Sequence, residues 1–327
     1  MEAKTLAVRV SKIRDEAIDI KSFELVAVDG KSLPAFIPGS HIDVHIGAPG
    51  GIIRQYSLCN GPATAKDAPD HYLIAVKKEA ASRGGSQAMH EQVKEGDVLQ
   101  ISAPRNNFEL RPEAGRHVLI GGGIGITPLL SMARHLLASG ADFEINYFSR
   151  SIKHTAFHEL LSAPEFKGKV AFHYAIEPDS IKAYLRNLLW ERPKDGHLYL
   201  CGPGPFMDTV QDVAAATWPP QTVHLEYFAA DASALAGPQD AFEVVLARSG
   251  GTYTVPAGES IVEALARNGI QVDVSCEQGV CGTCLTGVLE GTPDHKDVYL
   301  DDEERKACDK IMPCVSRSLS PKLVLDL

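Results

Sequence analysis

The chain has 327 residues, of which 44% are apolar and 23% charged, a composition typical of a soluble globular protein with two or three domains. Its net charge of −10 argues against nucleic acid as a partner. Glycines and Thr127-Pro128 interrupt the most apolar stretch, and the first twelve residues lack the apolar core of a secretory signal. We therefore expect no membrane span or membrane partner, and the seven cysteines, four of them with ligand spacing, favour a reducing cytoplasm over a disulfide framework.

The first segment, from Leu6 to Leu110, consists of short alternating runs of apolar and polar residues that are split by glycine and proline turns. The clearest runs are residues 6–10, 22–26, 41–46, 72–76 and 98–101. This pattern predicts an antiparallel β-barrel, which we assign to residues 1–112.

A strand in this barrel carries the run Arg54-Gln55-Tyr56-Ser57-Leu58. Alternate side chains of a strand share a face, so Arg54, Tyr56 and Leu58 project together while Gln55 and Ser57 point the other way. The first face can stack an aromatic ring and reach an anion. Taken alone, however, five such residues fit an ordinary strand with a polar end better.

The run Ser82-Arg83-Gly84-Gly85-Ser86 follows some twenty-five residues later. Two glycines free the backbone amides to converge on an anion, Arg83 supplies positive charge, and Ser86 is placed to cap a following helix. A plain turn is the alternative. The two motifs together in one barrel favour a cofactor that bears a phosphate.

From His117 to about Phe228, expected strands at residues 118–120, 143–148 and 197–200 alternate with helical stretches at 129–138, 156–162 and 207–216. This alternation predicts a parallel sheet with crossover helices, which we assign to residues 113–229.

Two glycine turns follow strands of this sheet, Gly121 to Pro128 and Cys201 to Pro205. Strand, glycine turn and helix form a pyrophosphate-binding arrangement, although Thr127-Pro128 departs from the strict dinucleotide fingerprint. Both turns are expected at the carboxyl edge of the sheet, where open α/β sheets bind their ligands.

A polar, alanine-rich stretch at residues 230–240 reads as a linker to a last domain at 241–327. That domain opens with a hairpin around Ser249-Gly250-Gly251. A helix follows, with Ser260 and Glu263 as a capping box and Gly269 as its stop. These elements predict a small β-grasp-like electron carrier.

The last domain contains Cys276, Cys281, Cys284 and, twenty-nine residues further on, Cys314. This is the ligand spacing of a plant-type 2Fe-2S cluster, whose iron prefers thiolate ligands. A zinc site is the alternative, but zinc ribbons usually have two Cys-x2-Cys knuckles. Cys308 competes as the fourth ligand, yet it lies in a charged segment, whereas Cys314 lies in an apolar one. We therefore expect Cys314 to be the ligand.

With these motifs, the chain resembles the phthalate dioxygenase reductase family, single-chain reductases of Rieske oxygenase systems, over essentially its full length. The resemblance implies three cofactors in chain order: FMN, NADH and the 2Fe-2S cluster. It further implies that electrons leave for a terminal Rieske oxygenase component.

The resemblance also implies residue roles. Arg54, Gln55, Tyr56 and Ser57 would contact the flavin, Ala75, Val76 and Lys77 would border it, and Arg83, Gly84, Gly85 and Ser86 would hold its phosphate. Thr127 and Phe228 would flank the ring. The dinucleotide would lie against residues of the two glycine turns, namely Gly122, Gly123, Gly125, Cys201, Gly202 and Pro203; for Cys201 a buried structural thiol is an equally good interpretation.

A hydride donor that gives two electrons and a cluster that takes one need a flavin between them. The expected chemistry therefore needs no general base, and we name no catalytic side chain. An oxygenase acting on substrate itself is disfavoured, because no Cys-x-His pair or evident two-histidine, one-carboxylate set occurs. The flavin and dinucleotide motifs likewise disfavour a redox sensor without enzymatic activity.

The preference for NADH rests on the resemblance. The strand at residues 143–148 ends in Ser149-Arg150, which could hold a 2′-phosphate, and it lacks the acid that normally contacts a ribose hydroxyl.

Overall fold

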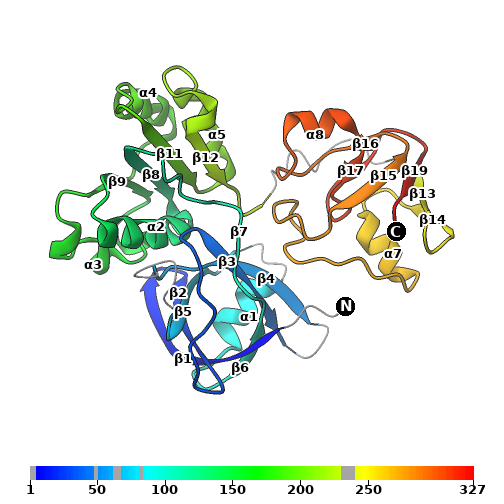
Figure 1. The fold of residues 1–327 in the computed structure, drawn as a ribbon, viewed down its shortest axis with the longest axis horizontal. Coiled ribbons are helices and arrows are strands. Elements are labelled where there is room, and N and C mark those ends of the chain that lie inside the picture. Colours follow the sequence, from blue (N-terminus) through cyan, green and yellow to red (C-terminus); the bar gives the residue numbers. More distant parts are fainter. Residues whose placement is uncertain (1–4, 48–50, 62–67, 81–83, 230–239) are drawn as a thin grey trace. The chain divides into compact units, whose positions relative to one another are not determined.

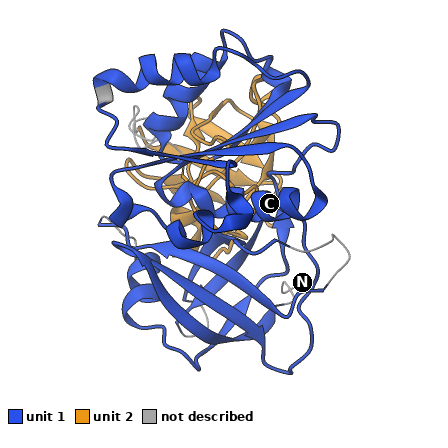
Figure 2. Ribbon diagram, turned by 90° about the vertical axis from the view of Figure 1, so that its left-hand side faces the viewer, with its two compact units in different colours: residues 1–226 blue, residues 227–327 orange. Residues whose placement is uncertain are grey.

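The computed structural model of the chain describes residues 5–47, 51–61, 68–80, 84–229 and 240–327. The chain forms two compact units, residues 1–226 and residues 227–327 (Figure 2). The first unit holds a β-barrel and a parallel sheet, and the second holds a smaller mixed sheet (Figure 1). The predicted class of fold, an antiparallel barrel followed by an α/β domain and a β-grasp-like domain, is thus confirmed.

The barrel is an antiparallel sheet with strand order β4-β3-β6-β1-β2-β5, in which β7 also pairs with β3. A bridge between Leu58 and Ile74 joins the end of β4 to β5. Alternate side chains such as Phe23, Leu25 and Ile42 fill the interior. The elements are β1 (Leu6–Ala17), β2 (Ile20–Ala27), β3 (Ser40–Ile46), β4 (Ile52–Ser57), β5 (His71–Lys77), α1 (Gly85–Glu91), β6 (Val98–Ile101) and β7 (Arg105–Asn106).

Helix α1 begins at the glycine pair itself. Its N-cap is Gly84, whose φ of 92° suits glycine and few other residues. Ser86 lies in the first turn, where its hydroxyl accepts a hydrogen bond from the Glu79 amide at 3.2 Å. The expectation that Ser86 caps this helix is therefore wrong.

The second sheet has the order β10-β9-β8-β11-β12, and all its pairings are parallel. All five strands therefore end at one carboxyl edge. The elements are β8 (Arg116–Gly122), α2 (Ile126–Ser139), β9 (Phe143–Ser149), α3 (His158–Leu161), β10 (Val170–Tyr174), α4 (Pro178–Leu189), β11 (Gly196–Cys201), α5 (Gly204–Ala214) and β12 (Val223–Glu226), with a 3-10 turn at Gly123–Gly125.

Three of these elements, β10, α4 and β12, were not expected from the sequence. Strands β10 and β12 lie at the two edges of the sheet, and only His173 of β10 is buried. An edge strand needs no continuous apolar run, so its pattern is weak.

Helix α2 forms the wall between the parallel sheet and the barrel (Figure 1). Its buried residues share one apolar cluster with Leu119 and Tyr199 of the sheet and with Cys59 and Ala75 of the barrel. The Ser131 hydroxyl also donates to the Asn60 carbonyl at 3.0 Å. The two sheets are therefore packed into one unit and do not form separate, independently moving domains.

The second unit is built on a mixed sheet with order β14-β13-β19-β15-β17 and its own core. The capping box at Ser260 is present, and Gly269 follows the helix with a φ of 79°, as predicted. The elements are β13 (Phe242–Leu246), β14 (Thr252–Val255), α7 (Ile261–Arg267), β15 (Thr286–Glu290), β16 (Pro293–Asp294), α8 (Asp302–Ala307), β17 (Lys310–Ile311), β18 (Arg317–Ser318) and β19 (Lys322–Leu325).

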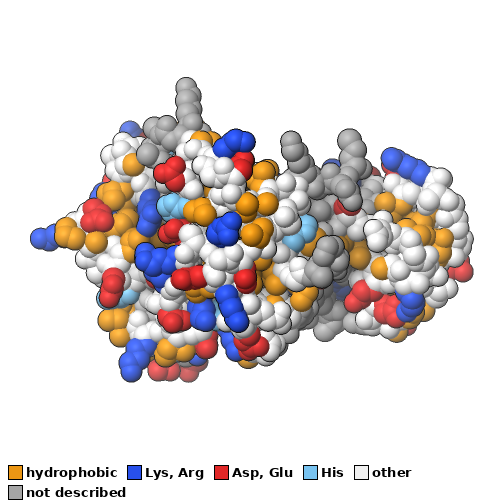
Figure 3. All heavy atoms as spheres, turned by 90° about the horizontal axis from the view of Figure 1, so that it is seen from below, with side chains coloured by type: hydrophobic (Ala, Val, Ile, Leu, Met, Phe, Trp, Pro, Cys, Tyr) orange, Lys and Arg blue, Asp and Glu red, His pale blue; other side chains and the backbone are white. Residues whose placement is uncertain are grey.

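Charged side chains of both signs are interspersed over the face of the first unit that Figure 3 shows at the left. Several form exposed ion pairs, such as Lys78 with Glu91 and Lys182 with Asp212. Exposed pairs of this kind contribute little to stability, because solvent screens them. Within the described residues, no helix is long and apolar enough to cross a bilayer.

Histidines from three strands of the parallel sheet meet around Tyr199. His197 Nδ1 lies 2.9 Å from His224 Nε2, and the two rings are stacked. His224 also stacks on Tyr199, and His117 meets that ring edge-on. Desolvation by burial lowers the pKa of His117 and of His224 to about 4, so the folded cluster is neutral at pH 7.

This cluster should make the first unit sensitive to acid. A histidine whose pKa is lowered by folding stabilises the fold less as the pH falls from the unfolded pKa of 6.5 towards the folded value of about 4. At pH 5 each such group should cost up to about 2 kcal/mol. We predict that His224→Gln reduces the loss of stability between pH 7 and pH 5. Urea unfolding followed by tryptophan fluorescence measures it locally, because Trp190 and Trp218 both lie in this unit.

His158→Gln is the matched control, because the His158 ring lies against Phe172 and outside the cluster. It should leave the pH dependence unchanged. If the free energy of unfolding falls equally between pH 7 and pH 5 in the wild type and in His224→Gln, the prediction is contradicted.

Candidate functional site: an electron-transfer chain on two units

The four cysteines predicted as ligands lie together in the second unit. Three sit on the loop between α7 and β15, and Cys314 lies between β17 and β18. Cys276 and Cys284 are buried, and Cys281 and Cys314 are half-buried. Hydrogen bonds join the thiols in two pairs, Cys276 with Cys281 and Cys284 with Cys314.

This pairing perturbs the thiols strongly. The hydrogen bond from Cys276 lowers the pKa of Cys281 to about 5, and the same bond raises the pKa of Cys276. Backbone amides add further donors, since Gln278 N lies 3.3 Å from Cys276 Sγ and Thr283 N lies 3.4 Å from Cys281 Sγ. The paired thiol and the loop amide therefore stabilise negative charge on the Cys281 sulfur in particular.

In the described part of the chain, no three His, Cys, Asp or Glu side chains gather as they would around a single metal ion. Two separated pairs of thiols instead fit a core of two irons, with one pair for each iron.

Cys308 has a different setting. It ends α8 in the left-handed conformation, with a φ of 55°, and its thiol donates to the Arg305 carbonyl at 3.3 Å. Cys314, by contrast, contacts Cys284 directly.

The two motifs of the barrel meet in the first unit. A Cβ atom on Gly85 would lie 2.5 Å from Arg54 Cγ, so the Arg54 side chain runs directly over the glycine pair. Gly84 likewise faces Ile52 of the same strand. Arg54 and Tyr56 are half-buried, and burial raises the pKa of Tyr56. Arg83 lies outside the described residues.

The other face of β4 makes different contacts. Gln55 Nε2 donates to Asp43 Oδ1 at 3.1 Å, and this carboxylate also pairs with Arg105 at 2.6 Å. The Gln55 side chain therefore belongs to a polar network on β3 and β7. On the neighbouring strand, Ala75 and Val76 are buried.

Lys77, the last residue of β5, is half-buried, and its ammonium pairs with Glu79 at 2.8 Å. Its positive charge is thus partly neutralised where β5 leaves the barrel.

The two glycine turns of the parallel sheet press against each other at the carboxyl edge. A Cβ atom on Gly125 would lie 2.2 Å from the Cys201 carbonyl oxygen, and one on Gly122 would lie 3.0 Å from Pro203 Cδ. Only glycine permits this approach. Gly202 and Gly123 complete the turns, and buried Thr127 donates to the Ile124 carbonyl at 3.0 Å.

Glu226, which the sequence analysis did not single out, lies at the end of β12 beside Cys201 of β11. The Ser57 hydroxyl of the barrel donates to Glu226 Oε2 at 3.4 Å. Desolvation raises the pKa of Glu226 to about 8 and that of Cys201 well above its usual value. Ser57, Cys201 and Glu226 therefore form one weakly solvated group between the two sheets. No signal in the sequence pointed to Glu226, because it is a single acid at the end of a strand that the sequence pattern did not predict.

Phe228 follows two residues later, at the start of the second unit, and is 38% exposed. Tyr227 and Phe228 are thus the first residues of the second unit, directly after β12 ends at Glu226.

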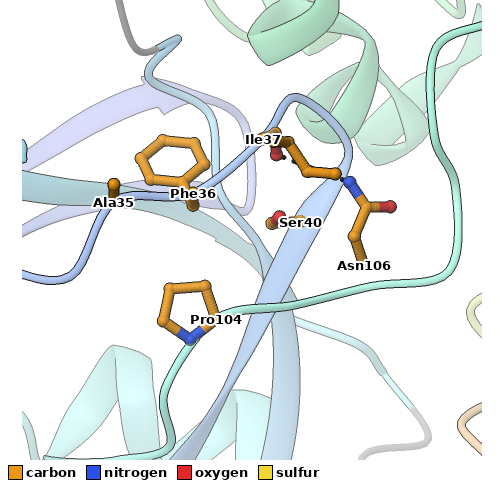
Figure 4. A pocket seen from close by; sticks show the side chains of 6 residues that line it. All are labelled: Ala35, Phe36, Ile37, Ser40, Pro104 and Asn106. Atoms are coloured by element: carbon orange, nitrogen blue, oxygen red, sulfur yellow. Dashed lines mark hydrogen bonds between the residues drawn. The ribbon is translucent and has the colours of Figure 1, made fainter. Parts of the chain in front are cut away.

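A hollow of about 270 Å³ lies elsewhere on the barrel, beside the start of β3 (Figure 4). It is lined by Ala35, Phe36, Ile37, Ser40, Pro104 and Asn106. The Asn106 amide donates to the Pro38 carbonyl at 2.8 Å and so fixes its rim. None of the residues predicted to bind a cofactor lines this hollow.

Comparison with known proteins agrees with this arrangement. The profile of the 2Fe-2S iron-sulfur cluster binding domain family matches residues 244–319, which confirms the cluster expected in the last domain. Vanillate O-demethylase oxidoreductase of Pseudomonas putida is 48% identical over 323 residues, which cover 98% of this chain and 99% of that protein.

Two solved structures are similar over 99% of this chain. One is phthalate dioxygenase reductase, described as a modular structure for electron transfer from pyridine nucleotides to 2Fe-2S, with a TM-score of 0.78, 39% identity and 98% of that chain covered. The other is an intact type IV self-sufficient cytochrome P450 monooxygenase, with a TM-score of 0.79 and 35% identity, of which 41% is covered.

We predict that Gly125→Ala weakens pyridine nucleotide binding by at least about tenfold, because the new Cβ drives the two turns apart at the carboxyl edge. It should also lower the melting temperature. Gly204→Ala is the matched control, since a Cβ atom there meets nothing within 4 Å. Titration calorimetry with NAD+, which has no hydride to transfer, separates the two variants, and equal affinities would contradict the close-approach argument.

Proposed function

The chain belongs to the phthalate dioxygenase reductase family, and from this we propose that it takes hydride from NADH onto FMN and delivers single electrons through a 2Fe-2S cluster to an oxygenase. The chain is an oxidoreductase. The observation that carries the proposal is the combination of two hydrogen-bonded thiol pairs in one unit with the Ser57 to Glu226 contact between barrel and sheet in the other.

For the flavin, we assign the face of β4 and the glycine pair. Arg54 lies over Gly85, so its guanidinium and the backbone amides of Gly84 and Gly85 can share one phosphate. Tyr56 supplies an aromatic surface for the ring. A bound flavin can accept two electrons together and release them one at a time. Such a compact phosphate site favours FMN over FAD, and chromatography of the released flavin identifies it.

The other residues of the proposed flavin site are those predicted from the sequence. It comprises the polar residues Gln55, Ser57 and Ser86, the border residues Ala75, Val76 and Lys77, the flanking residues Thr127 and Phe228, and Arg83. The Gln55 contact with Asp43 argues that any role of Gln55 is played by its backbone.

For the dinucleotide, we assign the paired turns at the carboxyl edge of the parallel sheet. The backbone of Gly122 and Gly125 packs against Cys201, Gly202 and Pro203, and a Cβ atom on Gly123 would meet nothing within 4 Å, which leaves room beside that glycine at the end of β8. Cys201 and the weakly solvated Glu226 border this position on the side of β12. The protein's part is to orient the donor and exclude water, with no general base.

For the cluster, we assign Cys276, Cys281, Cys284 and Cys314, two thiols for each iron. We also retain the division into a flavin domain at 1–112, a dinucleotide domain at 113–229, a linker at 230–240 and a cluster domain at 241–327. Most of the linker lies outside the described residues.

For the partner, we propose a terminal Rieske oxygenase, in line with the named oxygenase reductases among the relatives. The similarity to a self-sufficient P450 favours a second candidate, a haem monooxygenase. The chain can be reconstituted with a Rieske oxygenase component and, separately, with a P450 haem domain. The partner is the one with which NADH oxidation is coupled to formation of the oxygenated product.

We predict that Cys314→Ser abolishes or alters the EPR signal of the reduced cluster, because it removes a thiol that pairs with Cys284. Cys308→Ser is the control and should retain the signal, since the Cys308 thiol donates to the Arg305 carbonyl at the end of α8. The reverse pattern would refute this ligand set.

We predict that Cys281→Ser in the full chain separates the two halves of the electron path. NADH-driven reduction of the flavin and of ferricyanide should persist, because both need only the first unit. Reduction of cytochrome c and of the oxygenase should fall by about tenfold or more, because those electrons leave through the cluster. Full oxygenase turnover by this variant, or substrate oxygenation by the intact chain alone, would overturn the proposed function.

A further inference from the structure

A buried carboxylate, Asp297, lies in the segment between β16 and α8, and its side chain is 0% exposed. Its Oδ2 accepts hydrogen bonds from the backbone amides of Tyr299 at 3.2 Å and Leu300 at 2.9 Å. Its Oδ1 accepts a bond from the Ser316 hydroxyl at 3.1 Å. Both oxygens of this carboxylate are therefore engaged.

The groups that contact the Asp297 carboxylate are all hydrogen-bond donors. The Ser316 oxygen accepts a bond from the Lys296 amide at 3.1 Å, so its single proton is left for Asp297. The hydrogen bonds from Tyr299, Leu300 and Ser316 therefore all place a donor against a carboxylate oxygen.

The cations near Asp297 do not form a hydrogen-bonded ion pair with its carboxylate. Arg305 donates to the Asp297 backbone carbonyl at 2.6 Å, and His295 Nδ1 lies 3.7 Å from Oδ1. The His295 imidazole carries charge only when it is protonated.

Asp297 also packs against the cysteine loop. Gly279, between Cys276 and Cys281, has a φ of 70°, and a Cβ atom on it would lie 3.0 Å from Asp297 Cα and 2.6 Å from Val315 Cγ2. The Val298 amide donates to the Gly279 carbonyl at 3.0 Å. The segments that carry all four proposed ligands therefore meet at Asp297.

We propose that Asp297 is a positioning residue that holds the reduction potential of the cluster low, by placing a fixed buried negative charge against the cysteine loop. This rests on the proposed function and its ligand set. Reduction adds an electron to an already anionic thiolate cluster, and a nearby buried charge opposes it with little screening. Hydrogen bonding and charge around a cluster are known to tune its potential.

Asp297→Asn keeps the size of the side chain and removes its charge, so the cluster should become easier to reduce. We expect the equilibrium between oxidised and reduced cluster to shift by about tenfold at a given potential, which is about 59 mV for one electron. His295 and Arg305 are present in both the wild type and Asp297→Asn, so their contributions to the potential cancel to first order in the comparison.

Asp302→Asn is the matched control. It removes the same charge from the same unit, but Asp302 is exposed on α8. Its effect on the potential should be small and should vanish in high salt, whereas that of Asp297→Asn should persist. Redox titration of the full chain, read by the EPR signal and visible spectrum of the cluster, measures both. Equal shifts in the two variants would overturn the proposal.

Ser316→Ala tests the same charge from the other direction. It removes one donor to Asp297 and leaves the carboxylate less neutralised, so the potential should fall. This test decides the question even if Asp297→Asn does not assemble a cluster, because a rise or no change would contradict the proposal. A wild-type chain without a 2Fe-2S signal would instead refute the proposed function.

Discussion

The packing of helix α2 against two sheets is the constraint on which the rest of the molecule depends. Hydride transfer requires a donor and an acceptor held about 3–3.5 Å apart, and flexible domains would not keep that distance. Helix α2 contributes Ile126, Leu129 and Leu130 to a single apolar cluster that also contains Cys59 and Ala75 of the barrel. The barrel and the parallel sheet are therefore one body, as two-electron chemistry requires. The one-electron carrier has a separate core in the second unit.

The same packing explains the unusual state of Glu226. Its carboxyl lies where barrel and sheet meet, with Ser57 as its partner, and desolvation raises its pKa to about 8. An acid whose folded pKa lies above its unfolded value of 4.5 stabilises the fold fully at low pH and loses that contribution as the pH rises through 8. At neutral pH the carboxyl is therefore mostly uncharged. A neutral acid at this edge does not repel the anionic dinucleotide that the adjacent turns are proposed to bind.

The parts of the fold that sequence reasoning recovered are those with local physical signatures. The cysteine spacing, the Ser260 capping box and the alternating strands of the barrel each depend on residues close together in the chain. The edge strands and helix α4 were missed because few of their side chains are buried. Asp297 and Glu226 were missed for a different reason: each gains its character from burial among residues brought together by the fold. The error at Ser86 arose because a positive φ at Gly84 moved the start of the helix.

The contacts at the end of β9 bear on the proposed preference for NADH. Ser149 and Arg150 offered a hydroxyl and a guanidinium for a 2′-phosphate, which argued for NADPH. In the folded chain, Ser149 Oγ lies 2.8 Å from Thr155 Oγ1 and donates to the Ser151 carbonyl, while Ser151 Oγ bonds to His154 Nδ1. The hydroxyl that would accompany Arg150 is thus committed to the loop that follows the strand. A phosphate there would have to break these bonds and would gain mainly the exposed Arg150, whose single charge is well hydrated. This cost favours the coenzyme without the extra phosphate, although no acid at the end of β9 binds its ribose.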